Sequence, residues 1–155
     1  MKILVTGGTG YIGAHTVVEL MNSGFDVDII DNLNNSKEEV VDAIAKITGK
    51  RPLWFNIDLC DANEIKNYFS KHKPDAVVHF AAHKAVGLSV EQPLAFYHNN
   101  LLSLINLLQC CVEAKCNSFV FSSSCSVYAD PDKLPIDENA PVKTAKSPYG
   151  NTKKI

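Results

Sequence analysis

The sequence predicts an α/β domain in which helices cover both faces of a doubly wound parallel sheet. Short runs of β-branched and apolar residues alternate along the chain with longer segments of helical periodicity. Several of the short runs are apolar throughout, as strands covered on both faces must be. The length of 155 residues suits a single domain.

Five segments have the length and composition of buried strands, and they fall at residues 3–6, 27–30, 53–57, 76–80 and 118–122. Helices fit between them at residues 11–23, 37–48, 62–72 and 93–115. Gly24 and Gly49 follow two of these helices, where a left-handed residue ends a helix, and Asp61 is a suitable N-cap for the third. The four prolines within residues 130–148 indicate a loop.

The long helix at residues 93–115 has almost no polar side in its middle, because leucine and isoleucine fill most of residues 101–108. A helix of this kind buries two faces. We expect one face to cover the sheet and the other to meet a second subunit, which predicts a homodimer. The alternative is that a further part of the same chain covers the second face.

Composition excludes several classes of protein. The net charge of -2 gives no electrostatic footprint for nucleic acid or an anionic membrane. No apolar stretch is long enough to span a bilayer, and the apolar start of the chain is too short for a signal peptide. The five cysteines are odd in number and form no C-x-x-C pair, which indicates reduced thiols in a cytoplasmic protein without a metal site.

A glycine-rich turn follows the first expected strand and opens the first helix. The turn runs from Thr6 through Gly7, Gly10 and Gly13. Glycine is needed here because a Cβ would keep the backbone away from a pyrophosphate and would crowd the helix against the strand. The start of the helix then offers unpaired N–H groups to the phosphates.

An acid follows at the expected distance from this turn. Asp31 ends the second strand, 18 residues after Gly13, where a carboxylate can accept both hydroxyls of an adenosine ribose and repel a 2′-phosphate. No arginine lies nearby, so the pattern favours NAD over NADP. Asp58 follows the third strand and is placed either to meet the adenine or to cap a turn.

The fifth strand and the segment after the proline loop carry the candidate catalytic groups. Ser124 closes a run of three serines, which are costly to bury without hydrogen bonds. Pro148 suits the first position of a helix, so that Tyr149 and Lys153 share one helix face. Such a pair can do acid–base work, because a nearby ammonium favours the phenolate.

These residues together resemble the extended short-chain dehydrogenase/reductase family, and within it the nucleotide-sugar 4-epimerases. The resemblance extends over the whole chain and is carried by the segments 5–13, 31–36, 79–81, 84–87, 121–124 and 147–150. It implies a Rossmann-like domain and an enzyme that interconverts UDP-galactose and UDP-glucose through a transient 4-keto sugar. It also implies that residues 1–155 are the N-terminal, NAD-binding part of a longer chain whose C-terminal substrate domain is absent.

The resemblance also implies a role for individual residues. Tyr149 would take the proton of the C4 hydroxyl, Ser124 would orient that hydroxyl, and Lys153 would bind the nicotinamide ribose. The residues expected to contact NAD are Gly7, Gly10, Tyr11, Ile12, Gly13, Asp31, Asn32, Asn35, Ser36, Asp58, Leu59, Phe80, Ala81, Ala82, Lys84, Asn99, Tyr149 and Lys153.

The chain departs from the family pattern in a few places. Ala82-His83 stands where Gly-Leu is usual, Leu88 replaces a glutamate, and Ala129 replaces a glycine. Cys125-Ser126 follows Ser124, whereas a nucleotide-sugar dehydratase would need an acidic pair there. The other alternative is a non-catalytic NAD-binding regulatory fragment, which would have no need of Ser124, Tyr149 and Lys153.

Overall fold

The computed structural model describes all 155 residues and contains a five-stranded parallel sheet. The strands are β1 (Lys2–Thr6), β2 (Asp26–Ile30), β3 (Leu53–Phe55), β4 (Ala76–His79) and β5 (Ser118–Phe121). Their order across the sheet is β3-β2-β1-β4-β5. The chain moves outward from β1 to β3 and then crosses back to β4, so the order reverses between β1 and β4. This is the doubly wound topology that the sequence predicts.

Between and after the strands the chain forms six α-helices and one short 3-10 helix. They are α1 (Tyr11–Asn22), α2 (Glu39–Thr48), α3 (Ala62–His72), α4 (Val86–Glu91), α5 (Pro93–Ala114), η1 (Cys125–Tyr128) and α6 (Pro148–Lys154). No helix of the structure has the length and apolar character needed to cross a bilayer.

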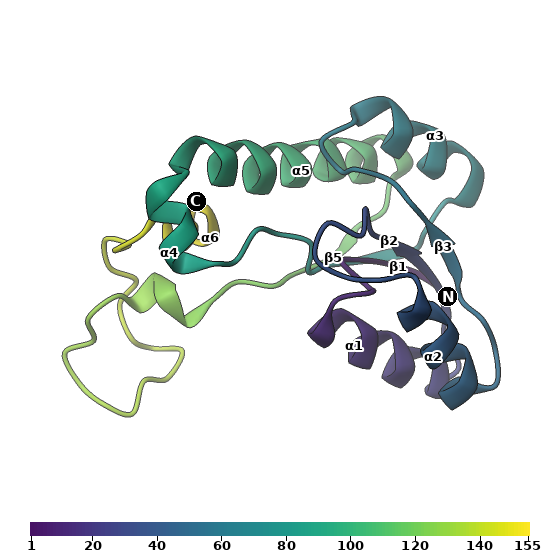
Figure 1. Cartoon of the computed structure of the whole chain (residues 1–155), viewed down its shortest axis with the longest axis horizontal. Helices are drawn as coiled ribbons and strands as arrows, with labels where there is room; N and C mark the ends of the chain where they lie inside the picture. Colours follow the sequence, from purple (N-terminus) through teal and green to yellow (C-terminus); the bar gives the residue numbers. More distant parts are fainter. The chain divides into compact units, whose positions relative to one another are not determined.

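Two apolar clusters hold α1, α2, α3 and α5 to the sheet, and Figure 1 shows the helices and strands to which their residues belong. On one face, Val17 of α1 and Ile44 of α2 pack with strand residues that include Ile29. On the other face, Ile65 of α3 and Leu107 of α5 belong to a cluster that also contains strand residues. Both clusters are buried, so each face of β1 and β2 is covered as a parallel sheet requires.

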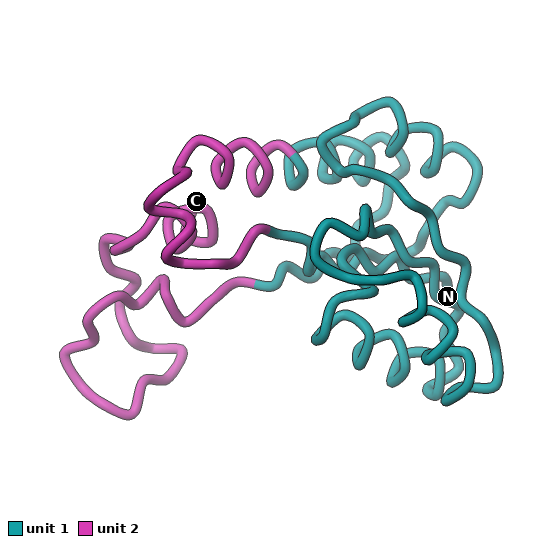
Figure 2. The backbone as a smooth tube through the Cα atoms, in the orientation of Figure 1, with its two compact units in different colours: residues 1–82, 103–122 teal, residues 83–102, 123–155 magenta.

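The chain divides into two compact units, coloured separately in Figure 2. Unit 1 comprises residues 1–82 and 103–122 and contains the whole sheet. Unit 2 comprises residues 83–102 and 123–155 and contains α4, η1, α6 and the first part of α5. The candidate residues are therefore described within each unit.

The expected strands and long helices are confirmed, with ends that differ by a few residues at most. Asp61 caps α3, accepting hydrogen bonds from the N–H groups of Asn63 and Glu64, and Gly49 ends α2 with a left-handed backbone. No regular element occurs between η1 and α6, so the loop prediction is also confirmed. The sequence reading missed α4 and η1, which are short.

Candidate functional site

The glycine turn of unit 1 leads from β1 into α1. Gly10 is the N-cap residue of α1, and no side chain caps this helix. The Gly10 N–H donates to the carbonyl oxygen of Gly7 at 3.1 Å, which closes the turn. No acidic residue occupies the first turn of α1. The first N–H groups of the helix, with their partial positive charge, are therefore suited to an anionic ligand.

Two glycines of this turn have no room for a side chain. A Cβ on Gly7 would lie 2.7 Å from the backbone nitrogen of Ala81, and the φ of Gly7 is +72°. A Cβ on Gly13 would lie 2.9 Å from the Cα of Gly8. These close approaches pack the turn against the segment after β4 and against the start of α1. The backbone crowding that the sequence predicts at these glycines is therefore present in the structure.

Asp31 is held by groups from two segments of unit 1. Its carboxylate accepts a hydrogen bond from the Thr9 N–H at 3.1 Å, which ties it to the glycine turn. It also accepts bonds from the Leu33 N–H at 3.0 Å and the Ser36 hydroxyl at 3.2 Å. Ser36 in turn lies 2.6 Å from the Thr9 hydroxyl. The carboxylate is therefore fixed beside the turn, although each of its oxygens can accept further hydrogen bonds.

The other residues expected at the adenosine end lie near Asp31 in the sequence or the fold. Asn32 donates a hydrogen bond to Asp58 at 3.3 Å, and Asp58 also accepts from the Cys60 N–H at 2.8 Å. Leu59 is buried, with 6% of its surface exposed, and Asn35 is exposed in the turn after β2. Asp58 therefore caps a turn, which is one of the two roles that the sequence left open, and it also faces Asn32; its contact with the adenine stays a prediction.

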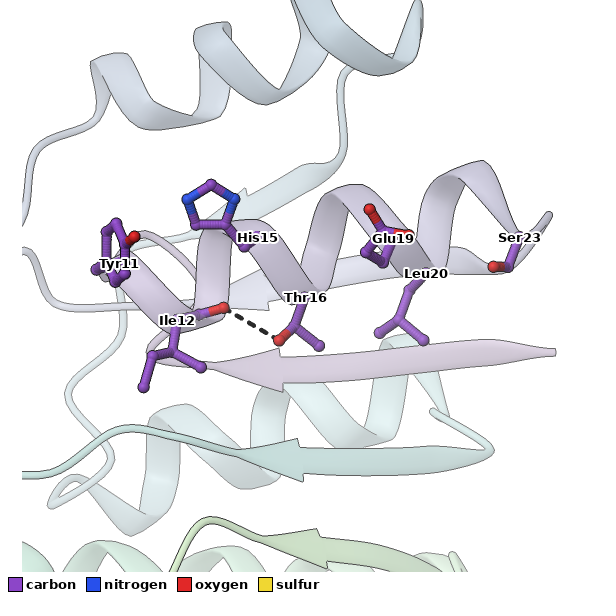
Figure 3. A pocket seen from close by; sticks show the side chains of 7 residues that line it. All are labelled: Tyr11, Ile12, His15, Thr16, Glu19, Leu20 and Ser23. Atoms are coloured by element: carbon purple, nitrogen blue, oxygen red, sulfur yellow. Dashed lines mark hydrogen bonds between the residues drawn. The ribbon is translucent and has the colours of Figure 1, made fainter.

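Tyr11 and Ile12 lie on the open side of α1. Their side chains are 79% and 60% exposed, and they line one end of a shallow groove that continues past Thr16 and Leu20 (Figure 3). Thr16 donates a hydrogen bond to the Ile12 carbonyl oxygen at 3.0 Å, also drawn in Figure 3. Exposed apolar side chains at the start of α1 are available to contact a ligand that lies on the turn.

Ser124 of unit 2 combines two structural hydrogen bonds. It is the N-cap of η1, and its hydroxyl oxygen accepts from the Ser126 N–H at 3.2 Å and from the Ser126 hydroxyl at 2.9 Å. A serine hydroxyl has one proton to donate and two lone pairs. With both lone pairs engaged by Ser126, the remaining capacity of Ser124 is that of a donor.

Tyr149 and Lys153 lie four residues apart in α6, as predicted. Pro148 starts the helix and Ser147 caps it by accepting the Gly150 N–H at 3.1 Å. Lys153 is 8% exposed, and burial lowers the pKa of its ammonium to about 8. Tyr149 is half-buried. A desolvated ammonium one helical turn from a phenol is an arrangement suited to acid–base chemistry.

An amide that the sequence reading missed connects three segments of unit 2. Asn100 accepts the His83 N–H at 2.8 Å and donates to the His83 carbonyl oxygen at 2.9 Å and to the Thr152 hydroxyl at 3.0 Å. It also accepts from Asn99 at 3.0 Å. A buried asparagine among leucines was the available signal, because such a group must find partners. Lys84 is exposed, just before α4.

The structure thus gathers the predicted residues into two groups. In unit 1, residues 7–13, Asp31 and Ser36 form one connected turn and carboxylate. In unit 2, residues 149 and 153 share α6, while Asn99 is tied to it through Asn100 and Thr152. The unit 1 group suits a dinucleotide, because it combines a glycine-rich turn for phosphates, helical N–H groups that no side chain caps, and a fixed carboxylate for a ribose diol.

Comparison with known proteins agrees with these features. A model of the NAD dependent epimerase/dehydratase family matches residues 3–155. The chain is 47% identical over 155 residues to a UDP-glucose 4-epimerase of Schizosaccharomyces pombe, covering 97% of this chain and 43% of that protein. It is 43% identical over 153 residues to the UDP-glucose 4-epimerase of Yersinia enterocolitica, covering 99% of this chain and 46% of that protein.

Solved structures are similar to this chain over nearly its whole length. The UDP-glucose-4-epimerase of Stenotrophomonas maltophila, determined with bound NAD and formylated UDP-arabinopyranose, matches with a TM-score of 0.94 and 43% identity, covering 99% of this chain and 45% of that chain. The UDP-glucose 4-epimerase of Bifidobacterium longum, in complex with NAD+ and UDP, matches with a TM-score of 0.97 and 40% identity, covering 99% and 46%. The chain therefore spans somewhat less than half the length of the proteins it matches.

Proposed function

Because the chain belongs to the NAD dependent epimerase/dehydratase family, we propose that the full-length protein is a UDP-sugar 4-epimerase that interconverts UDP-galactose and UDP-glucose with NAD. The observation that carries the proposal is the presence of Ser124, Tyr149 and Lys153 in a chain 47% identical to a UDP-glucose 4-epimerase. A protein that only bound NAD would have no use for these three residues.

We assign the pyrophosphate of NAD to the glycine turn and its adenosine ribose to Asp31. The assignment is supported by the crowded Cβ positions of Gly7 and Gly13 and by the hydrogen bonds that fix Asp31. A carboxylate at this position repels a 2′-phosphate, which favours NAD over NADP. When bound, NAD would supply the hydride acceptor, and later the hydride donor, for C4 of the sugar.

The chemistry of the sugar hydroxyl is assigned to unit 2. We propose that Tyr149 takes the proton from the C4 hydroxyl and returns it to the epimeric alcohol. Lys153, whose ammonium is partly desolvated, favours the phenolate and binds a ribose hydroxyl. Ser124 orients the sugar oxygen by donating its proton, because Ser126 already occupies its lone pairs.

The test is a product assay on the full-length protein supplied with UDP-galactose, with UDP-glucose as the expected product. Tyr149→Phe should lose turnover by at least about a hundredfold and keep bound NAD. Tyr68→Phe is the matched control, because Tyr68 bonds Asp28 within unit 1 and should leave turnover intact. Bound NAD without product would indicate a regulatory protein, and a 4-keto-6-deoxy sugar would indicate a dehydratase; either result would overturn the proposal.

We also propose that residues 1–155 are the NAD-binding domain of a longer, cytoplasmic polypeptide. The shares of 43% and 46% of two relatives that the chain covers support the first part. None of the five cysteines forms a disulfide, which supports a reducing compartment. Residues 1–155 alone should show little or no epimerase turnover; measurable interconversion of the two UDP-sugars by this segment would contradict the domain assignment.

A homodimer through α5 is the remaining part of the proposal. Ile105, Leu108 and Val112 follow one another at helical spacing and are 51%, 39% and 79% exposed. An exposed apolar stripe on a helix that also covers the sheet suits a second copy of the chain. Ile105→Glu should shift the full-length protein from dimer to monomer in sedimentation experiments, whereas Lys115→Glu, one residue after the end of α5, should not. A monomeric wild type would contradict this part.

A further inference from the structure

We propose that His79 is a positioning residue for the glycine turn and acts through the hydroxyl of Thr6, an inference that rests on the proposed use of NAD. Thr6 Oγ1 and His79 Nδ1 are 2.6 Å apart. Both residues are buried, with 0% and 1% of their surface exposed. Neither is among the residues expected to touch the cofactor, so the pair has no role in the chemistry assigned above.

The pair lies where the strand order of the sheet reverses. Thr6 is the last residue of β1, His79 is the last residue of β4, and the two are directly paired in the parallel register. Ligands of open α/β sheets bind at the carboxyl ends of the strands, at this kind of switch point. The Thr6–His79 hydrogen bond therefore joins the two strands at the edge of the sheet from which the glycine turn departs.

The residues that follow the pair come into backbone contact. Gly7 follows Thr6, and Phe80 and Ala81 follow His79. A Cβ on Gly7 would lie 2.7 Å from the Ala81 nitrogen, so there is no space between the turn and the segment after β4. The Phe80 N–H donates to the Thr6 carbonyl oxygen at 3.0 Å. The Thr6–His79 hydrogen bond is thus a second link between the ends of β1 and β4, and it fixes how closely Gly7 approaches Ala81.

The two partners are themselves held in place. The ring of His79 lies 6.2 Å from that of Phe119 and 5.9 Å from that of Phe121, measured between centroids. Its carbonyl oxygen accepts the Ser122 N–H at 3.1 Å, which extends the link to the end of β5. Thr6 is β-branched and has few side-chain rotamers. A hydrogen bond between two such groups positions the backbone with little additional loss of side-chain freedom.

A purely structural hydrogen bond would behave differently. Its loss would lower the free energy of unfolding and leave the NAD affinity of the folded protein unchanged. If His79 and Thr6 position the turn, loss of the bond lets Gly7 move away from Ala81 and weakens the contacts of the turn with the pyrophosphate. NAD affinity, compared with stability, therefore separates the two roles.

The experiment uses four variants of the full-length protein: Thr6→Val and His79→Phe remove the bond, while Thr6→Ser and His79→Asn keep a hydrogen-bonding group near the same place. NAD affinity is measured by calorimetric titration and stability by urea unfolding. We expect NAD affinity to fall about tenfold in the first two variants and to stay within about twofold in the others. The control is Tyr68→Phe, which removes the buried hydroxyl that donates to Asp28 at 2.8 Å; it should lower stability only.

The outcomes distinguish this inference from the proposed function. If Thr6→Val binds NAD as tightly as the wild type while losing stability as Tyr68→Phe does, the positioning role is wrong and the proposed function stands. If the wild-type full-length protein binds no NAD, both are wrong. Should His79→Phe fail to fold, the comparison of Thr6→Val with Thr6→Ser decides the question.

Discussion

The carbonyl oxygen of Gly7 lies 2.2 Å from the position that a Cβ atom would occupy on Gly13. This is the tightest approach of the glycine turn; the carbonyl oxygen belongs to the backbone and a Cβ position is fixed by the backbone, so neither could rotate away. The turn and the first turn of α1 are therefore packed directly on each other. The relationship explains why the segment tolerates only glycine at position 13.

Gly13→Ala should lower the free energy of unfolding by about 2–4 kcal/mol, because the methyl group forces the turn and the helix apart. It should also abolish NAD binding by the full-length protein. Urea unfolding and calorimetric titration measure the two effects. The control is Gly87→Ala, because nothing lies within 4 Å of the Cβ position of Gly87. A Gly13→Ala protein with the stability and NAD affinity of the wild type would contradict the structure of the turn.

Asp31→Asn should weaken NAD binding about tenfold and narrow the preference for NAD over NADP. The Thr9 and Leu33 N–H groups donate to different oxygens of the carboxylate, so the amide keeps an acceptor for only one of them, and it loses the charge that repels a 2′-phosphate. Dissociation constants for both nucleotides give the ratio directly. Asp61→Asn is the control, since asparagine is an equally good N-cap for α3. An unchanged ratio would remove Asp31 from the site.

Lys153→Met should make the protein without NAD more stable at pH 7, by about 1–3 kcal/mol, while abolishing turnover. Burial lowers the pKa of Lys153 to about 8 in the folded state, against 10.5 for an ordinary lysine. The unfolded chain therefore binds more protons between pH 8 and 10.5, and the stability of the wild type rises with pH in that window.

The advantage of the methionine variant should accordingly shrink as the pH rises from 8 toward 10. Unfolding by urea at pH 7 and pH 9.5 measures the change. Lys154→Met serves as the control, because Lys154 is exposed and next in sequence. A difference between Lys153→Met and the wild type that does not depend on pH would show that the ammonium is not desolvated.

Ala129→Gly should stabilise the protein by about 1 kcal/mol. Ala129 has φ 51° and ψ -118°, a backbone conformation that glycine adopts without strain. The matched control is Ala43→Gly in the middle of α2, where the same change should destabilise by a similar amount. We expect the melting temperature of Ala129→Gly to lie above that of the wild type and the melting temperature of Ala43→Gly to lie below it.

The longer elements were predictable from the sequence because their periodicity is strong. The sequence predicts helix α3 with its observed ends, because Asp61 marks its start and apolar residues recur at helical spacing. Helix α4 was not predicted, because it has six residues, contains Gly87 and exposes Val86 and Val90. So short a helix has no pattern that separates it from a loop.

The candidate site was predictable as a set of residue types and only partly as a set of contacts. The glycine turn and Asp31 could be read from spacing, because each follows a strand directly. The hydrogen bond from the Thr9 N–H to Asp31 and the bond between Thr6 and His79 join residues 22 and 73 positions apart. Such pairs depend on which strands are neighbours, and strand order is not encoded in any one segment.

The position of Ser124 at the head of η1 affects how any experiment on this residue must be designed. The same oxygen that would meet the sugar also starts a helical segment through Ser126. Replacement by alanine would alter local folding and catalysis together, so a loss of rate could not be attributed to either. Threonine keeps the hydroxyl and the cap while adding a methyl group, which makes Ser124→Thr the variant that isolates the steric demands of the reacting sugar.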